Sequence, residues 1–347
     1  MAKTGPCDIA VVSWHTHNTM FDEIGADLQK SGHRIVRYPN REAFGAARDP
    51  LNGVDVLLCA ANFPVTRAML TAASRLRAVV SAITGTEGVD LAAATDCAVV
   101  VANAQTSENI TGMAEATVLL ILAALYDFNG TQELIRKSLP RPDPLRARQL
   151  CGKAVGFVGL GKIGKESARL LAPFGAHMQY AARRDAELAG LPAMRRVDLD
   201  TLMRTSDVVV VLASLNADSR GLLSAEKLRL MKKSAIFINL SRGAIVDEKA
   251  LIAMLQQGAI AGAALDVFET EPLPADSPLR ALPNVILTPH MVGHTSEAHH
   301  SLEVATRDNL DRILSGQAPR YAVNAAVLPA WLAKWGAGLN SGISRPS

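Results

Sequence analysis

Short apolar runs alternate with amphipathic segments along the first third of this chain. Residues 9–13 and 33–38 are rich in β-branched side chains and predict strands, with a helix over residues 19–30 that ends at Ser31-Gly32. Further runs predict strands at 54–60, 77–83 and 98–102 and a helix at 66–73. Strands that alternate with helices indicate a parallel, doubly wound sheet.

The same alternation resumes after a polar, proline-rich connector at residues 138–148. The pattern predicts strands at 155–158, 177–181, 208–212, 235–240, 261–267 and 285–287, with helices at 162–174, 224–231 and 248–256. We therefore expect two α/β layers in succession. The Gly- and Ser-rich residues 336–347 are expected to be disordered.

Residues 108–128 are apolar nearly all round, which predicts a helix that is buried between two layers or at a subunit contact. The longest uninterrupted apolar stretch, 118–126, is too short to span a bilayer. The amino terminus has no apolar signal core. We therefore expect a cytoplasmic protein with no membrane contact.

Composition narrows the class of partner. With 347 residues, 49% hydrophobic and 20% charged, the chain is long enough for two globular domains. Its net charge is only +3 and no basic run is present, so no nucleic-acid partner is expected. The cysteines are widely separated and form no CxxC pair, so we expect neither a metal site nor a disulfide framework: Cys7, Cys59, Cys97 and Cys151.

A glycine motif follows the strand predicted at 155–158. Gly159, Gly161 and Gly164 have the spacing of a dinucleotide fingerprint, and they lie between a strand and an amphipathic helix, as that motif requires. The first glycine makes the tight turn, the second lets the backbone approach a pyrophosphate, and the third lets helix and strand pack closely. The motif predicts a nicotinamide-dinucleotide site.

The end of the next strand indicates which dinucleotide binds. A chain that prefers NAD usually has an Asp or Glu there to accept hydrogen bonds from the ribose hydroxyls. This chain has Ala182, followed by Arg183 and Arg184, whose guanidinium groups suit a 2′-phosphate. A solvated arginine pair is the alternative interpretation. We expect NADP(H) to be preferred, with NAD(H) possible.

Polar residues also follow predicted strands, where a parallel sheet has its ligand-binding edge. In the first half these are the loops at 14–16, 62–64 and 84–88. In the second half, Arg242, Glu271 and His290 follow successive strands. Each alone is more often a capping, solvated or core residue. Together, after a dinucleotide fingerprint and on successive parallel strands, they predict a cation, a carboxylate and an imidazole that face one nicotinamide.

Four motifs occur in order along the chain: GLGKIG at 159–164, NLSRGAIVD at 239–247, GAALDVFETEP at 262–272 and TPHMVG at 288–293. In these the chain resembles the D-isomer-specific 2-hydroxyacid dehydrogenase family, in particular its glyoxylate/hydroxypyruvate reductase-like branch. The resemblance implies that Arg242 binds the substrate carboxylate and that His290 is the acid/base with Glu271 as its partner. It also implies substrate contacts from Thr84, Gly85 and Asn109. The implied cofactor contacts are Gly159, Gly161, Lys162, Ile163, Gly164, Arg183, Arg184, Leu212, Ala213, Leu240, Asp266 and Gly293.

The resemblance further implies a Rossmann cofactor domain inserted into a flavodoxin-like substrate-binding domain, both doubly wound parallel sheets, with the active site in the cleft between them. The substrate domain is then expected at 1–107 and 294–330, the cofactor domain at 108–293 and a tail at 331–347. In relatives, the segment matching Ala114-Glu115 helps to build a homodimer.

The chain departs from the family pattern in places. The substrate loop reads ITGTEGVD, with fewer glycines than usual, and a common His-Val-Pro segment is replaced by residues 212–214. Asn109 resembles a residue of the formate dehydrogenase branch, but that branch pairs its histidine with Gln, so formate oxidation is not expected. The leading hypothesis is an NADPH-dependent glyoxylate or hydroxypyruvate reductase. Alternatives are an NAD-dependent dehydrogenase of another D-2-hydroxy acid, such as 3-phosphoglycerate, and a non-catalytic nucleotide-sensing protein.

Overall fold

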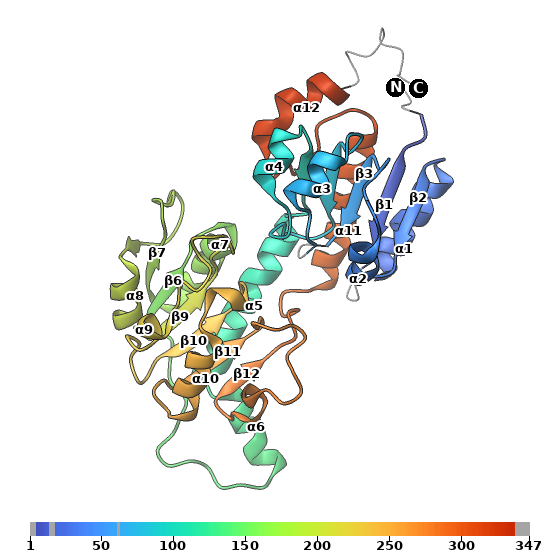
Figure 1. Cartoon of the computed structure of the whole chain (residues 1–347). Helices are drawn as coiled ribbons and strands as arrows, with labels where there is room; N and C mark the ends of the chain where they lie inside the picture. The colour runs from blue at the N-terminus through green and yellow to red at the C-terminus, as the bar shows by residue number, and fades with distance from the viewer. Residues whose placement is uncertain (1–4, 14–17, 61–62, 337–347) are drawn as a thin grey trace. The chain divides into compact units, whose positions relative to one another are not determined.

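The computed structural model describes residues 5–13, 18–60 and 63–336 (Figure 1). The chain forms two compact units. One, here called the split unit, comprises residues 1–109 and 296–347, and the other, the inserted unit, comprises residues 110–295. The loop at 14–16, residue 62 and residues 337–347 of the expected tail lie outside the described residues.

The split unit is built on a five-stranded sheet in the order β2-β1-β3-β4-β5, in which every neighbouring pair is parallel. This 2-1-3-4-5 order is that of flavodoxin-like folds. The strands are β1 (Asp8–Val12), β2 (Arg34–Tyr38), β3 (Val56–Cys59), β4 (Ala78–Ser81) and β5 (Val100–Ala102). The helices are α1 (Asn18–Lys30), α2 (Arg41–Ala46), α3 (Arg67–Ala72), α4 (Leu91–Asp96), α11 (Ser296–Leu314) and α12 (Leu328–Trp335).

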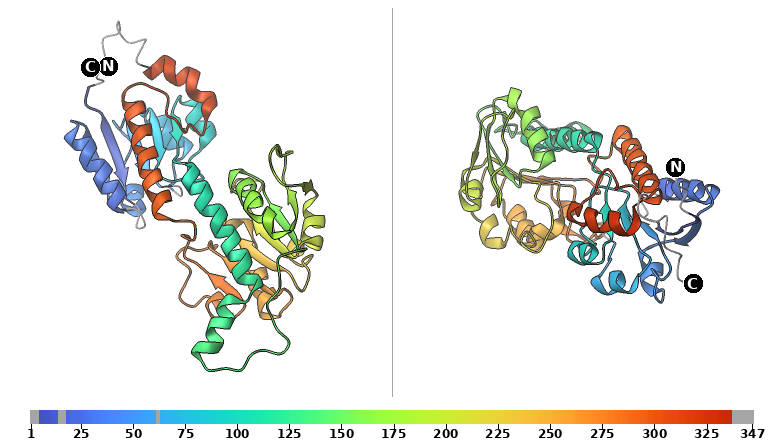
Figure 2. Two further views of the ribbon diagram at one scale, coloured as in Figure 1. Left: turned by 180° about the vertical axis from the view of Figure 1, so that it is seen from behind. Right: turned by 90° about the horizontal axis from the view of Figure 1, so that it is seen from above.

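Both faces of this sheet are covered, because successive side chains of a strand point to opposite faces. Ile9 and Val11 of β1 pack with α1, α11 and α12, whereas Ala10 and Val12 pack with α2, α3 and α4. Figure 2 shows the long helix α11 running along one face of the sheet. The continuous apolar runs of the strands follow from this two-sided burial.

The inserted unit has a seven-stranded, wholly parallel sheet in the order β12-β11-β10-β9-β6-β7-β8. Read from the other edge, β8-β7-β6-β9-β10-β11 has the 3-2-1-4-5-6 order of dinucleotide-binding folds, with the order reversing between β6 and β9, and β12 extends it. The strands are β6 (Ala154–Val158), β7 (His177–Ala181), β8 (Met194–Arg196), β9 (Val208–Val211), β10 (Ile236–Asn239), β11 (Gly262–Leu265) and β12 (Val285–Leu287). The helices are α5 (Ser107–Leu125), which begins in the split unit, α6 (Phe128–Arg136), α7 (Lys162–Leu171), α8 (Leu199–Thr205), α9 (Ala225–Leu228) and α10 (Glu248–Gln256).

Helices also cover both faces of the second sheet. Val208 and Val210 of β9 face α5 and α7, and Val209 and Val211 face α8, α9 and α10. The two sheets and their strand orders confirm the predicted α/β fold class.

Helix α5 bears on two expectations. By length and composition alone it could cross a membrane, although its longest purely apolar stretch is short, because small and weakly polar residues extend the apolar window. Within that window 44% is buried, and Leu120, Ile121 and Leu125 pack on the sheet of the inserted unit. The helix is therefore a core helix on one side. Its other side is not buried between two layers, since Leu119 is 59% exposed, and the alternative of a subunit contact stays a prediction.

The sequence pattern missed several elements and misplaced several boundaries: the strands predicted at 54–60, 77–83, 98–102 and 261–267 and the helix predicted at 224–231 are all shorter in the structure. Strand β8 and helices α2, α4, α6, α8, α11 and α12 were not predicted, and the helix expected at 162–174 ends at Leu171 before a 3₁₀ turn at Ala172–Phe174. The tail expected from residue 331 is wrong for 331–335. These residues belong to α12, in which Trp331 is fully buried and donates from Nε1 to the carbonyl oxygen of Arg77 at 2.7 Å.

Candidate active site

His290 and Glu271 meet beyond the carboxyl ends of β11 and β12. The imidazole Nδ1 lies 2.7 Å from Oε2 of Glu271, and Oε1 of Glu271 accepts a hydrogen bond from the N–H of Phe268 at 3.0 Å. Among the described residues, Nε2 of His290 has no hydrogen-bond partner. The side chains are 35% and 29% exposed. The carboxylate therefore orients the ring and leaves Nε2 for another group.

Burial of Glu271 by itself raises its pKa. The hydrogen bond and charge of His290, the hydrogen bond from Phe268 and the charge of Arg242 outweigh burial, so the pKa of Glu271 lies below its ordinary value. The carboxyl group is thus ionised at neutral pH, and an ionised carboxylate beside an imidazole stabilises the imidazolium form.

Arg242 lies directly after β10, at the start of the 3₁₀ turn Gly243–Ile245. Its Nη1 donates to the carbonyl oxygen of Ser241 at 2.7 Å. Gly243 explains how this turn approaches the segment after β11, because a Cβ at that position would lie 2.0 Å from the carbonyl group of Phe268. The glycine thereby brings the charge of Arg242 close enough to lower the pKa of Glu271.

Asp266 holds the loop that carries His290. It is 2% exposed, and its Oδ1 accepts hydrogen bonds from Oγ1 of Thr288 at 2.7 Å and from the N–H groups of Met291 and Val292 at 3.0 and 3.2 Å. Burial outweighs these bonds and raises the pKa of Asp266. His290 has a backbone φ of 55°, a left-handed conformation that is uncommon for a residue with a side chain. The buried carboxylate offsets that strain.

The glycine motif fits a dinucleotide phosphate. Gly159 has φ +88°, and a Cβ there would lie 2.7 Å from Cα of Ala213, so only glycine suits this turn. At Gly161 a Cβ would meet nothing within 4 Å, which leaves space beside the start of α7. Among the described residues, the N–H groups of Lys162, Ile163 and Gly164 make no hydrogen bond. This is the arrangement that binds phosphate at a helix N-terminus.

The remaining predicted cofactor positions surround this turn and the sheet edge. Leu212 donates from its N–H to the carbonyl of Val158, and Leu240 donates to Val211, so both follow neighbouring strands. Gly293 packs on α5, where a Cβ would meet Sδ of Met113 at 2.1 Å. The fingerprint, Ala213 and the Asp266 loop thus all belong to the carboxyl edge of one sheet.

Arg183, the first of the two arginines after β7, has an anionic partner that the sequence does not predict. Arg183 forms an exposed ion pair with Asp218, a residue of the loop after β9. Arg196 of β8 donates to the carbonyl oxygens of Ala182 and Arg183 at 2.8 and 3.2 Å and pairs with Asp185 at 2.6 Å. The loop is therefore held by a third arginine, and the guanidinium of Arg183 already has an anionic neighbour.

The predicted substrate residues of the split unit are connected to one another. Oγ1 of Thr84 donates to Oδ1 of Asn109 at 2.9 Å, and Asn109 is 8% exposed. Gly85 lies in the same loop, after β4. These contacts order the loop from the side of α5.

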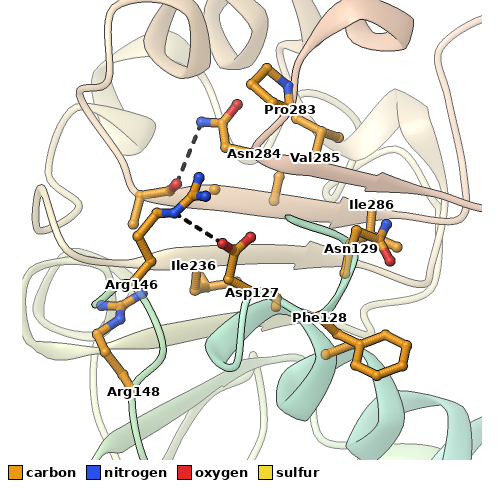
Figure 3. Close-up of a pocket in the computed structure, with 15 residues that line it drawn as sticks. Asp127, Phe128, Asn129, Arg146, Arg148, Ile236, Pro283, Asn284, Val285 and Ile286 are labelled. Atoms are coloured by element: carbon orange, nitrogen blue, oxygen red, sulfur yellow. Dashed lines mark hydrogen bonds and ion pairs between the residues drawn. The ribbon is translucent and has the colours of Figure 1, made fainter. Parts of the chain in front are cut away.

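Two hollows in the inserted unit lie away from these groups. The first, of about 250 Å³, is at the amino ends of β10, β11 and β12, the edge opposite His290 (Figure 3). Arg146 pairs there with Asp127 at 3.1 Å. The second, of about 550 Å³, is apolar, and its lining includes Leu119, Tyr126 and Phe174. Among the described residues no cluster of three or more His, Cys, Asp or Glu side chains could hold a metal ion.

Comparison with known proteins identifies the family. Residues 118–292 match the model of the D-isomer specific 2-hydroxyacid dehydrogenase NAD binding domain. A glyoxylate reductase of Thermofilum pendens is 38% identical over 282 residues, covering 79% of this chain and 82% of the relative. This chain belongs to the D-isomer-specific 2-hydroxyacid dehydrogenase family. The dehydrogenase is thus an oxidoreductase that uses a nicotinamide cofactor and acts on 2-hydroxy or 2-keto acids, as expected from its motifs.

Two further relatives show how broad that family is. A D-3-phosphoglycerate dehydrogenase of Methanocaldococcus jannaschii is 32% identical over 285 residues, covering 81% of this dehydrogenase but 54% of the relative. The crystal structure of an NADPH-dependent glyoxylate/hydroxypyruvate reductase from Sinorhizobium meliloti, in complex with NADP and malonate, superposes with a TM-score of 0.78 at 26% identity. The match covers 92% of this dehydrogenase and 97% of that chain.

Proposed function

We propose that this dehydrogenase is an NADPH-preferring reductase of a small 2-keto acid, with glyoxylate or hydroxypyruvate as substrate. The observation that carries the proposal is the His290–Glu271 pair with Nε2 of the imidazole unpaired among the described residues. Arg242, whose charge lowers the pKa of the same glutamate, supplies a cation for a carboxylate.

Each residue then has a distinct role in the reduction. A nicotinamide cofactor held at the glycine motif would supply the hydride for the carbonyl carbon. Arg242 holds the substrate carboxylate through two parallel N–H groups and fixes the orientation of the carbonyl. Protonated His290 donates a proton from Nε2 to the carbonyl oxygen, and Glu271 stabilises the imidazolium before that transfer. Asp266 keeps the loop of His290 in place.

The residues after β7 support the preference for NADPH. No carboxylate follows the strand directly, and Arg183 and Arg184 offer guanidinium groups that suit a 2′-phosphate. The pair between Arg183 and Asp218 indicates that this guanidinium already attracts an anion. In the proposal, the 2′-phosphate takes the place of the Asp218 carboxylate beside Arg183.

The alternative substrates are separated by one assay. Purified protein is mixed with glyoxylate, hydroxypyruvate, 3-phosphohydroxypyruvate or pyruvate, each with NADPH and with NADH, and the loss of reduced-nicotinamide absorbance is followed. We expect the highest kcat/KM with NADPH and one of the first two acids. A preference for NADH with the phosphorylated acid would favour the phosphoglycerate alternative, which the relative from Methanocaldococcus jannaschii supports. No turnover would favour the nucleotide-sensing alternative.

We also propose that the dehydrogenase is a homodimer. Leu119 and Tyr126 of α5 are 59% and 49% exposed, and Phe128 and Phe174 beside them are 55% and 40% exposed. Together they form an apolar surface over the second hollow. A contiguous exposed apolar surface marks an interaction site. Light scattering on the purified protein should give twice the mass of the chain, and a monomeric mass would contradict the proposal.

A further inference from the structure

In the loop after β4, the backbone carbonyl groups are hydrogen-bonded but most of the N–H groups are not. The carbonyl oxygens of Ile83, Thr84, Gly85 and Thr86 all accept hydrogen bonds. In contrast, the N–H groups of Thr84, Gly85 and Thr86 make none with any residue that the structure describes. Half-buried N–H groups without partners are uncommon, and several in succession form a concavity that binds anions.

Two uncharged side chains produce this asymmetry. Oγ of Ser81 donates to the carbonyl oxygen of Gly85 at 2.7 Å, with a longer contact of 3.2 Å to that of Ile83. Nδ2 of Asn103 donates to the carbonyl oxygen of Thr84 at 2.6 Å. A serine hydroxyl can also accept, and an asparagine offers both an acceptor and donors. In this loop both side chains act as hydrogen-bond donors. They therefore bind the carbonyl groups of the loop and leave its N–H groups without a partner.

Both side chains come from rigid parts of the split unit. Ser81 is the last residue of β4 and is 1% exposed. Asn103 follows β5, where its N–H donates to the carbonyl of Tyr321 at 3.1 Å and its carbonyl accepts from Nδ2 of Asn309 at 2.9 Å. Asn309 is fully buried in α11. The donors are therefore fixed by the core, independently of any ligand.

We propose that Ser81 and Asn103 are positioning residues that hold the loop with the amides of residues 84–86 available to the substrate carboxylate. The inference rests on the proposed function, because it takes the 2-keto acid as the ligand. Neither residue touches the substrate. Each acts by keeping a carbonyl oxygen, which would repel a carboxylate, turned toward the protein.

The test compares variants that remove each donor. In Asn103→Ala and Ser81→Ala, KM for glyoxylate at saturating NADPH should rise about tenfold, the equivalent of one lost hydrogen bond, while KM for NADPH is unchanged. Asn103→Asp should raise KM further, because its carboxylate repels both the carbonyl of Thr84 and an incoming anion. Ser81→Thr, which retains a hydroxyl, should restore most of the affinity.

A control separates positioning from simple stabilisation. Thr306 is fully buried in α11, and its Oγ1 donates to the carbonyl of Leu302 at 2.7 Å rather than to any group of the loop. Thr306→Val should lower the melting temperature and leave KM for glyoxylate unchanged. If the Ser81 and Asn103 variants also lost only thermal stability at wild-type KM, the inference would be wrong while the proposed function stood.

If the wild type reduces no keto acid, the proposed function is wrong, and the role of the loop must then be tested by binding. Isothermal titration of the NADP-loaded protein with oxalate then tests the loop directly. Binding by the wild type that weakens about tenfold in Asn103→Ala and Ser81→Ala, but not in Thr306→Val, would support the role of the two donors. Equal oxalate affinity in all four proteins, or none in the wild type, would overturn it.

Discussion

Glu271 holds His290 by one carboxylate oxygen while the other oxygen accepts the N–H of Phe268. Both oxygens are thus engaged, and the carboxylate has little freedom to rotate away from the imidazole. Because an ionised carboxylate can only accept, Nδ1 of His290 carries a proton whether the ring is neutral or charged, and the imidazolium carries a second proton on Nε2. The proton to be transferred in the reduction is therefore the one on Nε2.

Two replacements of Arg242 distinguish the effect of its positive charge from the effect of its two parallel N–H groups. In Arg242→Ala, kcat/KM for glyoxylate should fall about 10- to 100-fold, because a charged hydrogen-bonding partner of the carboxylate is lost. Arg242→Lys retains the charge but not the two parallel N–H groups, so it should recover only part of that loss. Steady-state kinetics at saturating NADPH measure both effects. Wild-type kcat/KM in the lysine variant would show that a point charge is sufficient.

Cofactor selectivity should respond to Asp218. Asp218→Asn removes the carboxylate that competes with a 2′-phosphate for Arg183, so KM for NADPH should fall about two- to fivefold, as expected for one exposed ion pair. KM for NADH should not change. The matched double variant Ala182→Asp/Arg183→Gln should shift preference toward NADH. An unchanged ratio of the two KM values in both variants would exclude this loop from selectivity.

Acid stability should depend on Glu271. Its pKa is lower in the folded protein than its ordinary value of 4.5, so its contribution to the free energy of unfolding is complete above 4.5 and is lost as pH falls through the lower folded value. Glu271→Gln cannot titrate and should lose less stability over that range. Urea unfolding at neutral pH and at pH values below 4.5 compares the two proteins. Parallel losses would contradict the assigned direction of the pKa shift.

Apolar patterns with clear polar or glycine boundaries predicted their elements well. Strands β7 and β12 and helix α10 have the bounds that the sequence indicates, because each combines a clear period with a polar or glycine boundary. Strand β8 was not predicted because two of its three residues are exposed arginines, so it has no apolar run, whereas the equally short edge strand β12 is wholly apolar. Residues 331–335 of helix α12 were assigned to the tail because the Gly- and Ser-rich sequence follows them directly, although Trp331 is buried.

The site shows a similar division. The positions of Arg242, Glu271 and His290 after strands could be read from the sequence, because parallel strands end at one edge. The residues that contact Arg183 and the loop after β4 could not be predicted from the sequence. Asp218 lies 35 residues from Arg183, and Ser81 and Asn103 are uncharged residues in no motif, so only the fold brings them to their contacts.

The central claim is that His290 supplies the proton. The most direct measurement is the rate of NADPH loss with saturating glyoxylate in the wild type and in His290→Ala, with NADPH affinity measured on both proteins by fluorescence titration. If His290 donates the proton, kcat should fall by a factor of about 10² to 10⁴ in His290→Ala while NADPH affinity is unchanged. A kcat within about twofold of the wild type would contradict it, because an acid worth that little is not the proton donor.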